Sequence, residues 1–443
     1  MKRLFAVLSF VLIMGLAACG GGAAETTPAD TPAPPTPTPA AEAQAPAEAA
    51  PTDAEPVELT VALFNFTTQP EFENTLNAWT AMNPHVTFDI IDTTSANFPE
   101  VLTTQLAGGR AIDLMYIVNL PLHATLAEAG QLMDLTDFVN GLGRNTEFGA
   151  ALDMIRTPDN RFFSVPWRQD FWPLFYNKDI FEAAGEPLPY NLTWDEYRDL
   201  AIRLTSGEGI DKVYGSHLHT WNSIVQAMAG AQLDEFMIQD DYGWLEYIYQ
   251  IRMDMQDAGA IMDLGTIIAG SVGYRPRFEM ENAAMIVMGS WYIGELAERA
   301  EFNWGIAPVP QMPGATEIRT MGGVTPIAIG ANANHPEEAL RFLEWVSGEG
   351  GALVLAEVGI PSAFMNDAVM DRFFSMPGMP TDDLSRRAFN PDFVRAEFPQ
   401  HPLSGIVDSI LLEEHQLIFV GDHSIEEGLR RMGERVGREL AQQ

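Results

Sequence analysis

Cysteine is almost absent from this chain, since Cys19 is the single cysteine among 443 residues. One thiol excludes disulfides within the chain and any metal site built from several cysteines. Basic residues are also scarce, because 25 Lys and Arg face 61 Asp and Glu and leave a formal net charge of −36. A field of that sign repels phosphate groups, so we expect no binding to nucleic acid or to polyanionic substrates.

Long apolar runs are scarce as well. After the first 20 residues no segment reaches the roughly 18 uninterrupted apolar residues that a membrane-spanning helix needs. The apolar run near the start, Leu4 to Met14, follows Lys2 and Arg3 and leads into small residues before Cys19. This layout is similar to a bacterial lipoprotein signal. The resemblance implies a signal peptide over residues 1–18, a lipid on Cys19, and an extracytoplasmic location at the membrane.

Residues 19–56 have a different composition, dominated by Pro, Ala and Thr. Nine of the thirty prolines fall between Pro28 and Pro56, and aromatic and large aliphatic side chains are missing. Such a segment cannot bury enough apolar surface to fold, so the sequence predicts a disordered tether. The remaining residues, 57–443, are numerous enough for two domains.

The start of this folded part alternates strand and helix patterns. Residues 57–64 alternate as in a strand, Pro70 opens a helix, and residues 86–92 and 112–118 read as further strands. This order predicts a parallel α/β sheet whose ligand lies beyond the carboxyl ends of the strands. The candidate ligand-binding residues in those loops are Asn65, Phe66 and Asn119.

The most informative stretch is FSVPWRQDFWPLFYNKDIFEAAG, residues 163–185. Proline favours an extended conformation for the residue before it, which predicts a strand and then a turn at Val165 and Pro166. The run that follows mixes aromatic rings with polar groups. Burying the polar groups costs free energy, and exposing the rings leaves apolar surface in water, so we expect the run to line a cleft. The candidate ligand-binding residues here are Trp167, Arg168, Gln169 and Asp170.

This stretch, with the LTWDEY segment at residues 192–197, resembles the extracellular solute-binding proteins of ABC importers, in the sugar-binding family that includes maltose-binding protein. The resemblance implies an α/β fold of two lobes, each a mostly parallel sheet flanked by helices. It implies a first crossing between lobes at Val165 and Pro166 and a second near Gly322 and Gly323, which together form a multi-strand hinge. The lobes would then comprise residues 57–165 with 326–363 and residues 166–325 with 364–443.

The same resemblance implies the function of a receptor that captures a carbohydrate and delivers it to a membrane permease. Trp291 matches the position where the family stacks a tryptophan on a sugar ring, while Trp221 and Tyr292 are further candidates. Aromatic rings suit the apolar face of a sugar, and carboxylates, amides and Arg suit its hydroxyls. We expect a monomer, no cofactor and no enzymatic activity.

Three alternatives remain at this point. His217 and His219 have the spacing of metal ligands on a strand, but no third ligand is evident nearby, so no metal site is expected. A secreted glycoside hydrolase needs two carboxylates across the scissile bond, and only Asp170 is well placed for that role. A polyamine ligand suits the negative charge and the tryptophans, because cations bind the faces of aromatic rings.

Overall fold

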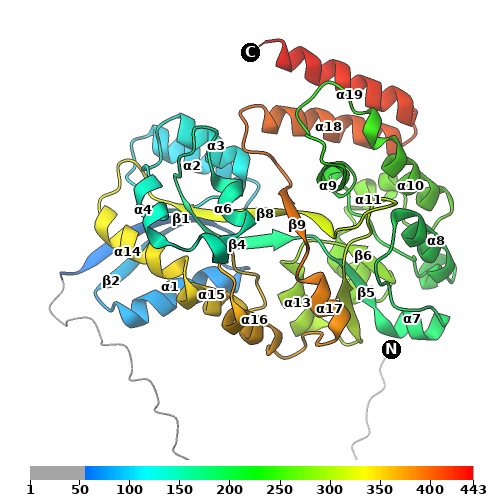
Figure 1. The fold of residues 1–443 in the computed structure, drawn as a ribbon, viewed down its shortest axis with the longest axis horizontal. Coiled ribbons are helices and arrows are strands. Elements are labelled where there is room, and N and C mark those ends of the chain that lie inside the picture. The colour runs from blue at the N-terminus through cyan, green and yellow to red at the C-terminus, as the bar shows by residue number, and fades with distance from the viewer. Residues whose placement is uncertain (1–54, 443) are drawn as a thin grey trace, which may run out of the picture. The chain divides into compact units, whose positions relative to one another are not determined.

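The computed structural model describes residues 55–442. The predicted signal peptide, most of the predicted tether and Cys19 lie outside this range. Figure 1 shows the described part as two lobes, with strands β4 and β8 running from one to the other. The two-lobe α/β fold that the sequence predicts is therefore confirmed. Within residues 55–442, none of the helices combines the length and the apolar character needed to cross a membrane.

The first lobe is organised around β1 (Val57–Phe64), which pairs in parallel with β2 (Val86–Thr93) and with β3 (Leu114–Tyr116). Its helices are α1 (Pro70–Met82), α2 (Phe98–Ala107), α3 (Leu120–Glu128), α4 (Thr136–Leu142), α5 (Asn145–Phe148) and α6 (Ala150–Ile155). The carboxyl ends of these strands point toward the other lobe, as expected for a ligand site at the strand ends.

Helices from much later in the chain complete this lobe. They are α14 (Pro336–Val346), α15 (Glu349–Ala356) and α16 (Asp367–Phe374), the yellow and light-orange helices of Figure 1. The ring of Trp79 in α1 packs against Phe342 and Trp345 of α14, with ring centroids 5.6 and 5.4 Å apart. The lobe is thus built from two separate parts of the sequence.

Two long antiparallel strands connect the lobes. Along β4 (Val165–Phe171) and β8 (Arg319–Ala328), Val165 pairs with Ile327 at one end and Phe171 pairs with Gly322 at the other. The predicted turn at Pro166 is wrong, because β4 continues through it. The register shifts between Pro166 and Arg168, and such an irregularity accommodates a residue that cannot donate a ladder hydrogen bond.

The second lobe contains a small sheet in the order β6 (Met285–Val287), β5 (Leu174–Asn177), β7 (Trp304–Ala307). Both pairings are antiparallel, so the mostly parallel arrangement expected for each lobe is wrong for this sheet. β5 follows β4 after only a short turn, and the chain between β5 and its partners β6 and β7 runs through several helices. Each partner returns to β5 in the opposite direction. In the first sheet, β8 also joins β3 in the antiparallel sense, whereas β9 (Phe393–Ala396) joins β8 in parallel.

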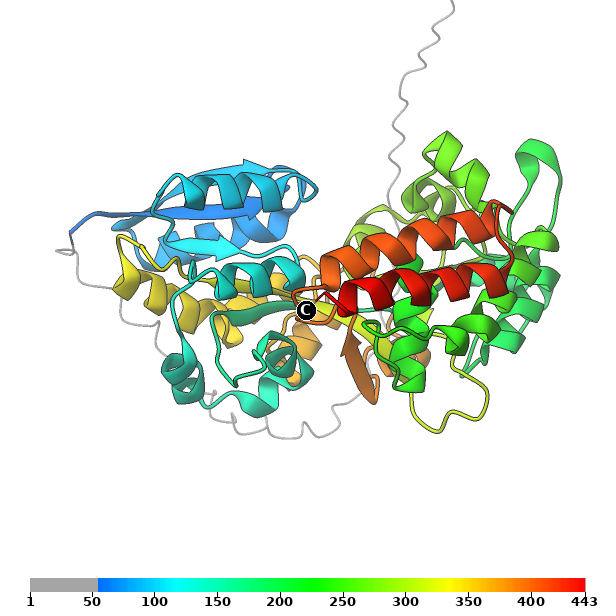
Figure 2. The same ribbon diagram turned by 90° about the horizontal axis from the view of Figure 1, so that it is seen from above.

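Helices surround the second sheet. They are α7 (Lys178–Ala184), α8 (Trp194–Leu204), α9 (Gln226–Leu233), α10 (Glu246–Asp257), α11 (Leu264–Gly270), α12 (Tyr274–Glu279), α13 (Tyr292–Arg299), α17 (Asp383–Ala388), α18 (Ser404–Phe419) and α19 (Ile425–Leu440). Gly185 ends α7 in the left-handed conformation, and Thr193 opens α8 with a capping box. The last two helices pack side by side on the outside of this lobe (Figure 2).

Candidate functional site

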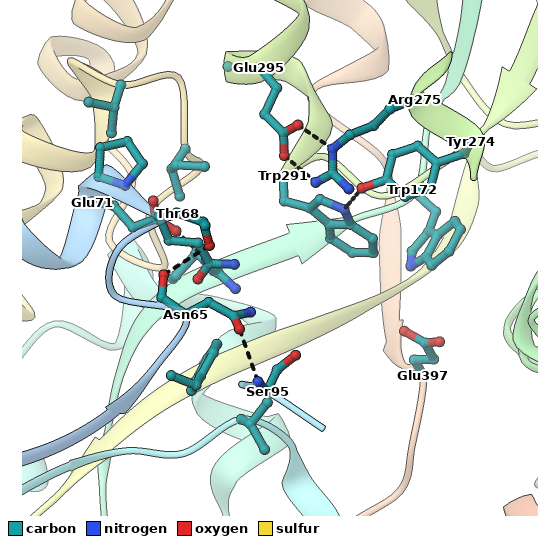
Figure 3. A pocket seen from close by; sticks show the side chains of 18 of the residues that line it. Asn65, Thr68, Glu71, Ser95, Trp172, Tyr274, Arg275, Trp291, Glu295 and Glu397 are labelled. Atoms are coloured by element: carbon teal, nitrogen blue, oxygen red, sulfur yellow. Dashed lines mark hydrogen bonds and ion pairs between the residues drawn. The ribbon is translucent and has the colours of Figure 1, made fainter. Parts of the chain in front are cut away.

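A cavity of about 850 Å³ lies between the two lobes. Its wall on the first lobe comes from the loops after β1 and β2 and from the start of α1, and its other wall comes from the second lobe (Figure 3). A smaller cavity of about 180 Å³ adjoins it along β4 and β8 and shares Arg168, Trp291 and Glu397 with it. The volume of the main cavity suits a small organic ligand of one to a few rings.

The second-lobe side of the cavity carries four aromatic side chains, Trp172, Trp221, Trp291 and Tyr274, hereafter the aromatic wall. The rings of Trp172 and Trp291 meet edge to face at 5.3 Å, and Trp291 donates a 3.4 Å hydrogen bond to the hydroxyl of Tyr274. Trp221 leans on His219, with ring centroids 4.3 Å apart, and is 36% exposed. The rings brace one another, so their faces are held in place before any ligand arrives.

The first-lobe side of the cavity carries five polar side chains, Asn65, Thr68, Gln69, Glu71 and Ser95, hereafter the polar wall. Asn65 adopts a positive φ of 53°, and its side chain accepts a 3.1 Å hydrogen bond from the backbone amide of Ser95. This bond joins the loops that follow β1 and β2. The left-handed conformation is one that Asn tolerates better than most residues.

A buried ion-pair network lies at the base of the cavity. Arg168 is 8% exposed and donates a 2.7 Å bond to Glu71, and its Nε lies 3.4 Å from a carboxylate oxygen of Asp170. The hydroxyl of Ser290 donates a 3.3 Å bond to Asp170 from the second lobe. Burial raises the pKa of both Glu71 and Asp170, while Arg168 opposes the increase in each. Arg168 thus holds together groups from both lobes.

Two further carboxylates, Glu397 and Asp408, line the second-lobe side of the cavity, and we call them the acidic corner. Burial raises the pKa of Glu397 to about 7, and the nearby charges of Asp408 and Asp170 add to the increase, whereas the side chains of Ser223 and Trp172 oppose it by hydrogen bonding. Burial also raises the pKa of Asp408, although the amide of Asn222 donates a 3.1 Å bond to it. Both carboxylates therefore lie where a negative charge is poorly stabilised.

Charged side chains also flank the opening. Arg275 donates two 2.5 Å bonds to the carboxylate of Glu295, and Arg299 lies 3.6 Å from the same carboxylate. Every Arg that lines the main cavity is therefore already paired with an acid of the protein. In a bidentate pair of this kind the guanidinium is held in one orientation.

Most of the candidates from the sequence reach a cavity. Asn65, Arg168, Trp221 and Trp291 line the main cavity. Asp170 and Asn119 line the smaller one, where Asn119 also caps α3 by accepting a bond from Leu122. The resemblance that singled out Trp291 thus identified a residue on the aromatic wall.

Four candidates do not reach a cavity. Trp167 is fully buried against Phe72 and Tyr116 in the first lobe, because alternate strand residues point to opposite sides and Arg168 and Asp170 take the cavity side. Gln169 faces away for the same reason. Phe66 follows Asn65 but packs against the core, and Tyr292 is fully buried with its hydroxyl on Glu279. These four assignments are corrected.

Sequence reasoning missed several lining residues: Trp172, Tyr274, Arg275, Glu295, Glu397, Asp408 and Glu71. The alternation along β4 could have identified Trp172, which follows Arg168 and Asp170 in steps of two. The acidic corner had no such signal. It lies in the part of the chain after residue 364, where no motif marks an approach to the cavity.

Comparison with known proteins gives consistent results. A solved sugar transporter from Rhizobium etli in an open conformation is 30% identical, with a TM-score of 0.78 over 86% of this chain and 99% of that one. An ABC substrate-binding protein from Listeria monocytogenes in complex with cycloalternan shares the fold, with a TM-score of 0.75 at 16% identity over 87% of this chain and all of the other. The lactose-binding protein of Rhizobium radiobacter is 22% identical over 60% of this chain and 64% of its own length. A family model for bacterial extracellular solute-binding proteins matches residues 65–353, and the chain belongs to that family.

Proposed function

We propose that this protein is the extracytoplasmic receptor of an ABC importer, which captures a carbohydrate between its lobes and delivers it to the permease subunits. The observation that carries the proposal is the pairing of an aromatic wall with a polar wall across one cavity of about 850 Å³. A sugar presents apolar CH faces and a rim of hydroxyls, and these two walls are complementary to its two kinds of surface. The known sugar-binding relatives support the same ligand class.

The proposed motion is closure of the lobes, divided at residues 57–165 with 326–363 and residues 166–325 with 364–443. The hinge would involve Val165 and Pro166 on β4 and Gly322 and Gly323 on β8, which lie at the two ends of the connecting strands. Closure would bring the polar wall onto a sugar already stacked on the aromatic wall. We further propose a monomer held at the membrane by a lipid on Cys19, on the basis of the sequence around that residue.

A thermal-shift screen of the purified protein against mono- and oligosaccharides tests the proposal. A ligand at about a hundred times its dissociation constant stabilises the folded state by roughly 2.7 kcal/mol, which raises the melting temperature measurably. We expect a shift with one group of saccharides. Shifts with amino acids or polyamines alone would contradict the ligand class.

Incubation with the saccharides found in that screen separates a receptor from a glycoside hydrolase. The cavity holds carboxylates, as a hydrolase would need, but the family consists of binding proteins. We propose that the chain has no enzymatic activity, so a bound oligosaccharide should be recovered intact. Appearance of shorter products on prolonged incubation, detected by mass spectrometry, would instead indicate an enzyme.

A further inference from the structure

The charges around the main cavity are unevenly compensated. Its three arginines, Arg168, Arg275 and Arg299, each pair with an acid of the protein. Within residues 55–442, by contrast, Glu397 and Asp408 form no ion pair with any Lys, Arg or His. Two partly buried carboxylates without a cation carry a cost that a positively charged ligand would remove.

A weakly engaged hydrogen-bond donor lies beside the acidic corner. Trp172 is 1% exposed and lines the cavity, and its indole Nε1 lies near enough to Glu397 to lower the pKa of that carboxyl. Among the described residues, however, no acceptor lies at normal hydrogen-bond distance from this Nε1. Figure 3 shows Trp172 between Trp291 and Glu397. A buried donor of this kind is costly unless a ligand or water accepts its bond. The surface next to Glu397 therefore offers an aromatic ring, a weakly engaged donor and two carboxylates without a cationic partner.

We propose that the ligand of this cavity is an amino sugar, whose ring lies on the aromatic wall and whose ammonium group pairs with Glu397 and Asp408. The inference rests on the proposed function and names its substrate class. A hydroxyl of the same sugar would accept the bond from Trp172 Nε1. A protonated amine also gains from the neighbouring tryptophan rings, whose faces attract cations.

The titration of Glu397 gives the proposal a second readout. The charged groups that face Glu397 are Asp408 of α18 and Asp170 of β4, and both raise its pKa, which is about 7 without a ligand. An ammonium group beside it would lower that pKa, so the complex holds fewer protons than the free protein near pH 7. Binding should therefore release protons, and affinity should fall as the pH is lowered from 7 to 5.

The test compares matched pairs of sugars by titration calorimetry at pH 7. Each pair consists of an amino sugar and its neutral parent, such as glucosamine with glucose, galactosamine with galactose, and the disaccharide of glucosamine with cellobiose. We expect the amine to bind at least about tenfold more tightly than its parent in any pair that binds. The measured enthalpy should also change with the ionisation enthalpy of the buffer.

Two variants make the test specific. Glu397→Gln keeps the shape of the side chain and removes its charge, so the preference for the amine over its neutral parent should fall by about tenfold. Glu182→Gln is the matched control, because Glu182 is an exposed acid of α7 that lines neither cavity. It removes the same charge from the protein and should leave both affinities unchanged.

The outcomes distinguish this inference from the proposed function. Equal or tighter binding of the neutral parents would overturn the amino-sugar assignment and leave the carbohydrate receptor intact. Binding of polyamines without any sugar would overturn both, whereas the absence of binding throughout the series would overturn the amino-sugar assignment alone. A preference for amines that survives in Glu397→Gln and in Asp408→Asn would remove the acidic corner from recognition and overturn the inference.

Discussion

The two walls of the cavity differ in chemistry and in how they are held. The aromatic wall consists of rings that brace one another on the second lobe, and Trp172 within it is almost fully buried. The polar wall lies on loops of the first lobe, where two side-chain bonds join the ends of β1 and β2, one from the amide of Ser95 to Asn65 and one from the amide of Phe66 to Asp92. The aromatic wall is thus preorganised, whereas the polar wall depends on loop conformation. From this difference we expect the second lobe to supply most of the affinity for the ligand, and the first lobe to add a smaller contribution when the lobes close.

Replacing Trp291 by alanine tests the aromatic wall most directly. The substitution removes a ring face and loosens Trp172, which packs against it edge to face. We expect affinity for the sugar found in the screen to fall about a hundredfold, or roughly 2.7 kcal/mol. Titration calorimetry measures the loss. Trp244→Ala is the control, because Trp244 is also half-buried on the second lobe but lines no part of the cavity, and affinity should not change there.

The acidic corner should cost the folded protein stability at high pH. The pKa of Glu397 is about 7 in the folded state and near 4.5 when unfolded, so the folded state holds a proton that the unfolded state releases between these values. The free energy of unfolding therefore decreases as the pH rises from 4.5 to 7. Glu397→Gln should recover about 2 kcal/mol at pH 8 and nothing at pH 4. Urea unfolding at both pH values measures this, and an equal effect at the two would contradict the assigned titration.

The strands that join the two walls contain a matched pair of glycines. A Cβ on Gly322 would lie 2.1 Å from the backbone oxygen of Asp170, whereas a Cβ on Gly323 would meet no atom within 4 Å. Gly322→Ala should therefore force β4 and β8 apart and lower the free energy of unfolding by about 2 kcal/mol, while Gly323→Ala should change it by less than about 0.5 kcal/mol. Denaturant unfolding compares them. Equal losses of unfolding free energy in the two variants would show that β4 and β8 can move enough to accommodate a Cβ on Gly322.

A glycine also holds the orientation of the aromatic wall. A Cβ on Gly289 would lie 1.9 Å from a ring carbon of Trp291, so Gly289→Ala should turn that ring without removing it. We expect about a tenfold loss of affinity, or roughly 1.4 kcal/mol, with a changed tryptophan fluorescence spectrum. Gly265→Ala, where the nearest atom is 3.5 Å away, is the control. Unchanged affinity in Gly289→Ala would mean that the orientation of Trp291 is not needed for binding.

The polar wall should show the smallest effect. Asn65→Ala removes the bond from Ser95 and places alanine at a φ of 53°, and we expect a loss of affinity of about threefold to fivefold, under 1 kcal/mol. Asn65→Gly keeps the backbone conformation available and separates the lost bond from the strain. A loss as large as that of Trp291→Ala would reverse the ranking of the two walls.

Much of this arrangement could be predicted from the sequence because its signals are local. The alternation of residues 57–64, the helix that begins at Pro70 and the helix that Gly185 ends all depend on neighbours along the chain. The resemblance of the motif around Trp291 to the family indicated a ligand-binding residue, and Trp291 lines the cavity. The hypothesis that Trp167 binds ligand failed, because the sense of the alternation depends on how β4 pairs with β8.

The sequence by itself determined the fold class, the composition of the region before the fold, and the aromatic and polar stretches from which a sugar site could be built. Only the tertiary structure decided which of those side chains meet. Glu397 and Trp172 are 225 residues apart in the chain, and both line the cavity because β9 and β4 join opposite edges of β8 at Gly322. The pKa of Glu397 follows from that meeting and from the burial it produces. Charge compensation depends on distance in space, and no local pattern in the sequence encodes that distance.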